Sequence, residues 1–265
     1  MTVTLLISTY NWPQALRLCI LSALSQSRMP DQIVICDDGS TSETVETVKA
    51  LQASSPVRID YVWQEDKGFR AAKSRNRGMA VATGEYIIQV DGDMLMHREF
   101  VADHLALARK GFLIRGRRIM LTPEATEHYC VAGELPRLDF RCKGVAKRRF
   151  NAIHMPSVAR WIAPHYRQGR PGFMGCNMSF WREDFMAVNG YDEFFEGWGS
   201  EDSDLGIRMT MNGVRHIDLK FAGIAFHLHH GHPFMHNRKK NQDYSERDRV
   251  PGEIRARKGL DQYLS

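Results

Sequence analysis

Strand-like and helix-like segments alternate through the first 93 residues, and this alternation restricts the possible folds more than any other feature. The expected strands are residues 3–9, 32–36, 57–63 and 85–90, and the expected helices are residues 13–27, 43–53 and 70–82. Apolar runs separated by helical patterns are typical of a parallel sheet with crossover helices. We therefore predict an α/β fold with a mostly parallel sheet flanked by helices.

Polar side chains follow these expected strands at the points where the strands end. They are Ser8-Thr9, Asp37-Asp38, and Asp91 with Asp93. In open α/β sheets, ligands bind at the carboxyl edge of the strands. The first 100 or so residues are thus predicted to hold a nucleotide-type site.

The triplet Asp91-Gly92-Asp93 is the central candidate for chemistry. Two carboxylates separated by a glycine can converge on one divalent cation, and the glycine lets a phosphate approach the backbone. Mg²⁺ and Mn²⁺ prefer such oxygen ligands. An isolated triplet could be an ordinary loop, but its place at a strand end favours a metal site.

Four histidines, at positions 227, 229, 230 and 232, follow a second apolar strand. One imidazole there could complete the metal shell, although a solvated histidine loop is the alternative. His227 lies nearest the strand end and is the first choice as ligand, and His229 is the second.

An acidic cluster, Glu201-Asp202-Ser203-Asp204, begins an expected helix over residues 201–212. Helix capping and favourable interaction with the helix dipole explain part of it. However, Gly197 and Gly199 flank Trp198 just before it, so a tight loop presents an aromatic face beside carboxylates. A sugar ring can stack on such a face, and one carboxylate could act as general base on an acceptor hydroxyl.

Charge is unevenly distributed along the chain. Residues 109–170 carry 14 basic and 4 acidic side chains, whereas residues 1–66 carry 4 basic and 8 acidic ones. The basic segment has no evident periodicity and is expected to be an irregular insertion. It suits an anionic membrane surface or phosphorylated substrates, whereas few interleaved aromatics argue against nucleic acid.

The chain has no stretch of ~18 consecutive apolar residues and no signal-peptide pattern at its start. Its five cysteines form no CxxC pair, so free buried thiols in a reducing compartment are expected. These features predict a cytoplasmic protein, with possible peripheral contact at the inner face of the membrane.

Five motifs, in this order, match a known family. They are STYNWP (8–13), CDDGST (36–41), DKGFRAAKSRNRGMAVATGEYIIQVDGD (66–93), GCNMSFWREDF (175–185) and GWGSEDSDLGIRM (197–209). The chain resembles the inverting glycosyltransferases of family 2, and the last two motifs look like the galactosyltransferase-type C-terminal segment. The resemblance implies a GT-A fold, which has a Rossmann-like sheet and a smaller C-terminal acceptor-binding part.

The resemblance also implies roles for individual residues. Asp38 would hydrogen-bond the base, Arg75 would reach the base or ribose, and Asp91 would approach ribose and metal. The full set matched to the nucleotide is Thr9, Tyr10, Asn11, Asp38, Lys73, Arg75 and Asp91. In the remaining roles, Asp93 and His227 would hold the metal with Asp91, Asp202 would be the catalytic base, and Trp198 and Glu201 would grip the acceptor.

Two departures from the family pattern stand out: Met94 follows the triplet where another acid is frequent, and residues 109–170 match no motif. The expected organisation is one compact catalytic domain with four parts. These are a nucleotide-sugar-binding half (1–108), the basic insertion (109–170), an acceptor and catalytic half (171–232), and a polar, weakly ordered tail (233–265).

The function implied is metal-dependent (Mn²⁺ or Mg²⁺), inverting transfer of a sugar from a nucleotide diphosphate sugar, a UDP-sugar by preference. The acceptor would be a hydroxyl of a glycan or lipid-linked glycan, as in synthesis of a bacterial surface polysaccharide or lipopolysaccharide. A nucleotidyltransferase is one alternative, but STYNWPQA is not the glycine-rich phosphate loop it would need. The other is a non-catalytic basic module binding membrane or nucleic acid.

Overall fold

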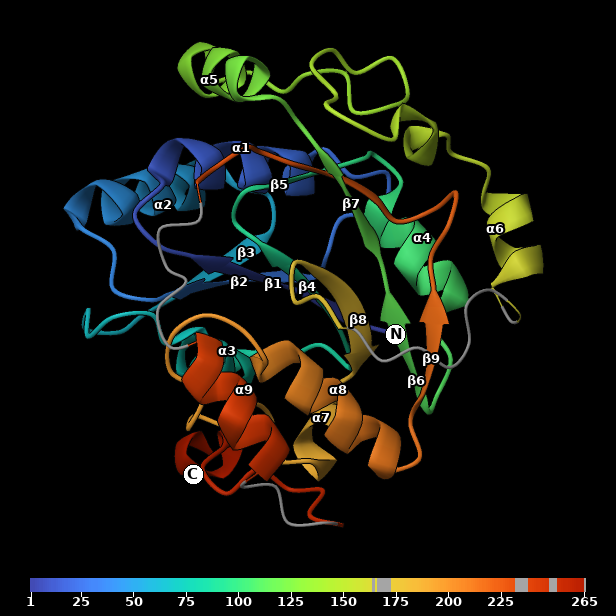
Figure 1. Ribbon diagram of the computed structural model, residues 1–265. Helices are drawn as coiled ribbons and strands as arrows, with labels where there is room; N and C mark the ends of the chain where they lie inside the picture. Colours follow the sequence, from blue (N-terminus) through green and yellow to red (C-terminus); the bar gives the residue numbers. More distant parts are fainter. Residues whose placement is uncertain (164, 166–172, 232–237, 248–251, 265) are drawn as a thin grey trace.

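A seven-stranded sheet forms the centre of the molecule in the computed structural model, which describes residues 1–163, 165, 173–231, 238–247 and 252–264. The strand order is β3-β2-β1-β4-β8-β6-β9 (Figure 1). The strands are β1 (Val3–Thr9), β2 (Gln32–Asp37), β3 (Arg58–Trp63), β4 (Tyr86–Asp91), β6 (Phe112–Arg115), β8 (Asn177–Trp181) and β9 (Arg215–Asp218). Only β8 runs antiparallel to its neighbours β4 and β6. The predicted mostly parallel sheet is confirmed.

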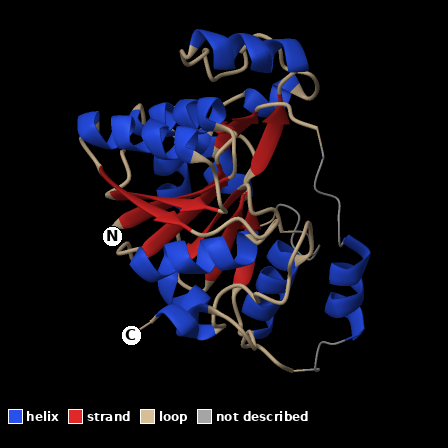
Figure 2. Cartoon of the chain, turned by 90° about the vertical axis from the view of Figure 1, so that its left-hand side faces the viewer, coloured by secondary structure: helices blue, strands red, loops and turns tan. Residues whose placement is uncertain are grey.

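Helices cover both faces of this sheet (Figures 1 and 2). One face packs against α1 (Pro13–Leu24), α2 (Ser42–Ser54) and α4 (Phe100–Leu107). The opposite face packs against α3 (Ala71–Val81), α7 (Arg182–Ala187) and α8 (Glu201–Met211). Because both faces are covered, the inner strands are buried along nearly their whole length and are mainly apolar, rather than alternating between buried and exposed residues.

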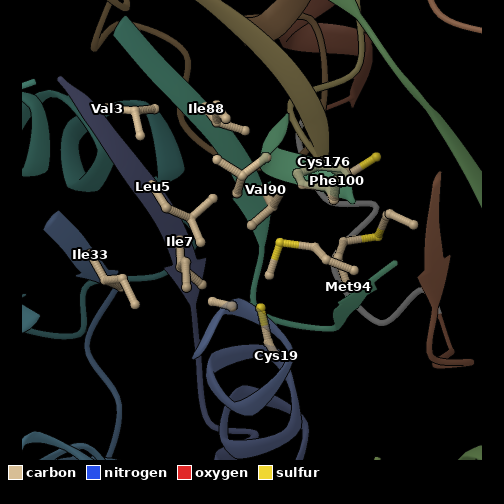
Figure 3. Packing of buried hydrophobic residues seen from close by; sticks show 14 of the residues in the cluster. Val3, Leu5, Ile7, Cys19, Ile33, Ile88, Val90, Met94, Phe100 and Cys176 are labelled. Carbon is tan, nitrogen blue, oxygen red and sulfur yellow. The ribbon is translucent and has the colours of Figure 1, made fainter. Parts of the chain in front are cut away.

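Alternate residues of β1 divide the core into two layers. Val3, Leu5 and Ile7 belong to the cluster on the α1 side, whereas Leu6 belongs to the cluster on the α3 side. Figure 3 shows the first layer, in which these side chains lie beside those of β4, with Cys19 of α1 beneath them. The five cysteines are free thiols, and all except the half-buried Cys130 are buried.

A second, three-stranded sheet brings the acidic triplet and the histidine cluster together. Its order is β5-β10-β7, with β5 (Met94–Met96), β7 (Arg117–Met120) and β10 (Ile224–His227). In the antiparallel β5–β10 pair, His227 lies opposite Met94, and the Leu228 amide donates to the Asp93 carbonyl at 3.0 Å. This register places the end of β10 against the acidic triplet.

The expectation that the basic segment is irregular is wrong for part of its length. It contains β6, β7, α5 (Pro123–Ala132), the 3-10 turn η1 (Arg149–Ala152) and α6 (Pro156–Ile162). Strand β6 lies inside the main sheet, between β8 and β9. Strands β6 and β7 are each four residues long, and arginines stand at the end of β6 and the start of β7, so their apolar runs are too short to show periodicity.

The expected weak order of the tail is also wrong for the described residues after 237. Helix α9 (Arg238–Arg247) and the 3-10 turn η2 (Leu260–Tyr263) are formed. The Ala256 amide donates to Val188 O at 3.0 Å, and the Leu260 amide donates to Asn189 O at 2.9 Å. Backbone hydrogen bonds and one buried leucine hold this segment, so a scan for apolar periodicity does not detect it.

None of the helices in the described part of the chain has the length and apolar character needed to cross a membrane.

Candidate active site

Asp93 lies beside two histidines at the junction of the sheets. Its Oδ2 is 3.1 Å from His230 Nε2 and 3.5 Å from His227 Nε2, and all three side chains offer ligand atoms within 4.8 Å of one another. His229 is exposed, and its amide donates to Thr126 Oγ1 at 2.8 Å. His232 lies outside the described residues. The structure thus brings His227 to Asp93 as expected, but it adds His230 where the sequence ranked His229 second.

The donor set suits a divalent cation. Asp93 Oδ1 and His227 Nδ1 are buried and have no hydrogen-bond partner among the described residues, so each has a lone pair or proton that the protein does not satisfy. Burial lowers the pKa of His227, which favours the neutral imidazole that a metal requires. The Asp93 hydrogen bond raises the pKa of His230. One carboxylate and two imidazoles fit Mn²⁺ better than Mg²⁺, because Mg²⁺ prefers an all-oxygen shell.

Arg75 joins the triplet to the acidic cluster of α8. Its Nη2 donates to Asp91 Oδ1 at 3.1 Å, and its Nη1 contacts Asp202 Oδ1 at 3.1 Å and Glu201 Oε1 at 3.3 Å. Its Nε donates to Ser8 Oγ at 3.0 Å. The guanidinium is buried and compensates three carboxylates that would otherwise repel one another.

Asp202 is held on both of its oxygens. Oδ2 accepts the Gly175 amide at 2.6 Å, and Oδ1 lies 3.0 Å from the hydroxyl of Tyr191. A Cβ at Gly175 would lie 2.4 Å from Asp202 Oδ1, so only glycine allows this approach. These contacts give Asp202, the candidate base, a fixed orientation. Burial, and then the Asp202 charge, raise the pKa of the neighbouring Glu201.

Residues expected to line the nucleotide gather at the ends of β1 and β2. Asp38 is buried and accepts from the Arg70 amide and from Gln64, each at 2.6 Å, and burial raises its pKa to about 6. Asn11 adopts a left-handed conformation with φ 46°, which asparagine tolerates better than most residues. Its amide donates to Ser40 Oγ at 2.8 Å.

The other matched residues lie on the same edge. Tyr10 donates its hydroxyl hydrogen to Asp66 Oδ2 at 2.9 Å. Thr9 is buried at the end of β1, and Lys73 is half-buried on α3, two residues before Arg75. These positions place the whole expected nucleotide set on the carboxyl edge of β1, β2 and β4.

The loop before α8 presents Trp198 to solvent, with 38% of its surface exposed. Gly197, Gly199 and Ser200 all have positive φ, a conformation that glycine adopts without strain. The Gly197 amide donates to Phe69 O at 2.8 Å, and Asn241 of α9 donates to Gly199 O at 3.0 Å. The loop is therefore supported from α9, in the segment that the sequence predicted to be weakly ordered.

Sequence reasoning missed three members of the site. His230 was one of four clustered histidines, and spacing alone does not show which of them turn towards Asp93. Tyr191 is the second residue of the segment GYDEFFEGWG, but a buried tyrosine is also an ordinary core residue. Gly175 was quoted only within a motif, and its role depends on a contact with a residue 27 positions away.

Two family models match the chain. Residues 4–129 match glycosyl transferase family 2, and residues 157–231 match a model described as the N-terminal domain of galactosyltransferase. Among curated relatives, the validoxylamine A glucosyltransferase of Streptomyces hygroscopicus subsp. limoneus is 30% identical over 80% of this chain and 48% of its own length. The chondroitin synthase of Escherichia coli is 24% identical over 85% of this chain and 34% of its own length. The chain thus spans about half or less of these relatives.

Solved structures show the same fold. The mannosyltransferase PcManGT from Pyrobaculum calidifontis, solved with GDP-Man and Mn²⁺, superposes with a TM-score of 0.62 and 19% identity over 88% of this chain and 58% of that one. S. aureus TarS 1-349 in complex with UDP-GlcNAc superposes with a TM-score of 0.58 and 16% identity, over 89% of this chain and 60% of that one. The fold is therefore the GT-A fold of glycosyltransferases. The chain carries a glycosyl transferase family 2 domain over residues 4–129, followed by a galactosyltransferase-type segment over residues 157–231.

Proposed function

We propose that the protein transfers a sugar from a UDP-sugar to a hydroxyl of a glycan acceptor, by a single metal-dependent displacement that inverts the anomeric centre. The observation that carries this proposal is the link through Arg75, which places Asp202 next to Asp91 and the metal-binding group. A carboxylate for the acceptor proton and ligands for a diphosphate-bound metal are thereby gathered at one sheet edge. Inversion in one step requires no covalent nucleophile.

Asp93, His227 and His230 would hold the divalent cation, with Asp91 between this group and the ribose. When bound, the cation would supply Lewis-acid stabilisation of charge on the diphosphate leaving group. His230 replaces His229, the second choice from sequence, because His230 Nε2 faces Asp93. The solved neighbour with Mn²⁺ and GDP-Man supports a divalent cation in this fold.

The proton of the acceptor hydroxyl would pass to Asp202 as the acceptor oxygen attacks the anomeric carbon. Gly175 and Tyr191 orient the carboxylate, and Arg75 keeps it ionised in a site crowded with acids. Trp198 would stack on the acceptor ring, and Glu201 would accept one of its hydroxyl hydrogens. Removing the acceptor proton in the transition state is worth about 10²–10⁴-fold in rate.

The nucleotide would occupy the edge formed by Thr9, Tyr10 and Asn11, with Asp38 at the base and Lys73 and Arg75 nearby. UDP is preferred over GDP on the resemblance already described; the solved neighbours hold UDP-GlcNAc in one case and GDP-Man in the other. The glycan acceptor is supported by relatives such as the chondroitin synthase. A role in bacterial surface polysaccharide or lipopolysaccharide synthesis follows as part of the proposal.

A screen of donor hydrolysis tests the donor and the metal together. UDP- and GDP-sugars would be incubated with Mn²⁺, Mg²⁺ or EDTA, and release of the nucleoside diphosphate measured. Slow release from one UDP-sugar that EDTA abolishes is the expected result. Release that EDTA leaves unchanged would contradict the metal role, and release from GDP-sugars alone would contradict the UDP preference.

Contact with an anionic membrane is the second part of the proposal, and one surface supports it. Phe150 and Trp161 are 80% and 79% exposed, and both lie in the basic segment, where Phe150 follows Arg149 and Trp161 follows Arg160. Aromatic rings beside cations suit the headgroup region of a bilayer. Binding to anionic vesicles should therefore fall with salt and with Phe150→Ser/Trp161→Ser. Equal binding to neutral vesicles would contradict an electrostatic contact.

A further inference from the structure

A second group of metal-binding side chains lies away from the active site. His97, Asp103 and His154 offer ligand atoms that all lie within 4.8 Å of one another. His154 Nε2 lies 2.9 Å from Asp103 Oδ1 and 3.0 Å from Oδ2. The rings of His97 and His154 face each other, with centroids 4.7 Å apart and planes inclined by 34°. Two imidazoles and a carboxylate thus converge on one point.

This group and the active-site group lie at opposite ends of the small sheet. His227 pairs with Met94 at one end of β10, whereas the His97 amide donates to Ile224 O at the other end. Ile224 and His227 are three residue steps apart along β10, which corresponds to about 10 Å. A cation held by His97, Asp103 and His154 would therefore be separate from one held by Asp93.

We propose that His97, Asp103 and His154 form a binding site for Zn²⁺. Each ligand comes from a different element, because His97 follows β5, Asp103 lies in α4 and His154 precedes α6. Nitrogen-rich sets with one carboxylate select zinc over magnesium. The three protein ligands leave a fourth position for water.

The surroundings of the group are those of an oriented ligand set. Asp103 is buried, and its Oδ2, which also contacts His154, accepts the Gly223 amide at 2.8 Å, which helps to fix the orientation of the carboxylate. His97 Nδ1 accepts the Glu99 amide at 3.1 Å, which helps to orient the ring.

The cation would fasten the basic segment to the catalytic domain. His154 stands between η1 and α6, and the Met155 amide beside it donates to Phe221 O at 2.8 Å. Asp103 and His154 are separated by 51 residues in the chain, so a bond between them through zinc would close a long loop. The segment bearing the exposed Phe150 and Trp161 would thereby keep its place on the domain.

The test is zinc titration of the tag-free, chelator-stripped full-length chain against a chromophoric chelator. The wild type should take up two equivalents, and the His97→Gln/His154→Gln variant one. The His227→Gln/His230→Gln variant should retain the second site, and adding His154→Gln should weaken that site at least ~10-fold. His128→Gln is the matched control, because His128 is exposed on α5 and outside both groups.

Zinc should also raise the unfolding temperature of the His227→Gln/His230→Gln variant. Unchanged stoichiometry in His97→Gln/His154→Gln, with a native circular dichroism spectrum, would overturn the site. Uptake of no zinc by the folded His227→Gln/His230→Gln variant would also overturn it, and would show that a hydrogen-bonded histidine–aspartate pair is all that the group forms. Neither result bears on sugar transfer, which depends on the group around Asp93.

Discussion

The hydroxyl of Tyr191 lies 3.0 Å from Asp202 Oδ1 and accepts a hydrogen bond from Gln89 Nε2 at 2.9 Å. Both Tyr191 and Gln89 are fully buried, and Gln89 also donates to Gly175 O at 3.0 Å. The glycine whose amide binds Asp202 and the tyrosine that contacts it are thus tied to the same glutamine. The orientation of the proposed base is determined by the core of the domain as well as by its own helix.

Tyr191→Phe removes one hydrogen bond to Asp202 and keeps the ring that packs under Arg75, 5.3 Å from its guanidinium. We expect kcat to fall about tenfold, which corresponds to one hydrogen bond of about 1.4 kcal/mol, with the dissociation constant for UDP unchanged. Steady-state kinetics and calorimetry measure the two quantities. A kcat equal to that of the wild type would show that Tyr191 is a core residue without effect on the base.

Asp202→Asn removes the proposed proton acceptor and preserves side-chain volume. We expect transfer to fall by about 10²–10⁴-fold, because an amide cannot take the acceptor proton, while binding of UDP with Mn²⁺ is retained. Near-normal turnover by a folded variant would exclude Asp202 as the base.

His230→Gln and His229→Gln form a matched pair for the metal site, because of these two histidines it is His230 that faces Asp93. We expect His230→Gln and Asp93→Ala to weaken metal-dependent binding of UDP at least ~10-fold, and His229→Gln to leave it unchanged. Calorimetry with and without Mn²⁺ measures this. The opposite order of the two histidine variants would restore the ranking made from sequence.

Arg75→Gln leaves Asp91, Glu201 and Asp202 without the buried guanidinium that they share. Removing one partner of a buried ion pair costs about 3–5 kcal/mol, so a fall of that order in the free energy of unfolding is expected in urea. Arg77→Gln is the control, because Arg77 lies on the same helix and donates only to Trp63 O. Equal loss in both variants would mean that α3 is sensitive to any change of charge.

Asp38 should make stability depend on pH. Burial raises its pKa to about 6 from an ordinary value of 3.8, so the native state binds this proton more tightly than the unfolded state does. Stability should therefore fall as pH rises from about 4 to about 6, by up to about 2–3 kcal/mol from this group. The free-energy difference between wild type and Asp38→Asn, measured across this range, isolates the effect. A difference that does not vary with pH would contradict it.

The parts of the fold that were predicted from sequence are those with long apolar runs. All four early strands and the three helices between them lie where the pattern indicated, within a few residues. The antiparallel strand β8 lay unassigned in the motif GCNMSFWREDF, because direction in a sheet depends on pairing partners far along the chain. The short strands β6 and β7 were missed because Arg115 ends the first and Arg117 begins the second, which leaves only short apolar runs.

The candidate site divides in a similar way. Asp91 and Asp93 are predictable because a strand end fixes where they lie, and Asp202 because a helix start does. The choice between His229 and His230 was not predictable from sequence. It depends on how the chain turns after Leu228, whose amide donates to the Asp93 carbonyl. Arg75 was expected at the base or ribose, and without ligand it lies among carboxylates.

The catalytic domain extends further along the chain than the region that matches known families. The second family match stops at residue 231, yet Asn241 supports the loop of Trp198 and Lys258 accepts the Glu193 amide at 2.9 Å through its carbonyl. An expression clone trimmed to the matched region would lose these supports while keeping every motif. Chimeras that exchange acceptor preference should therefore carry residues up to 264 together with the loop they hold.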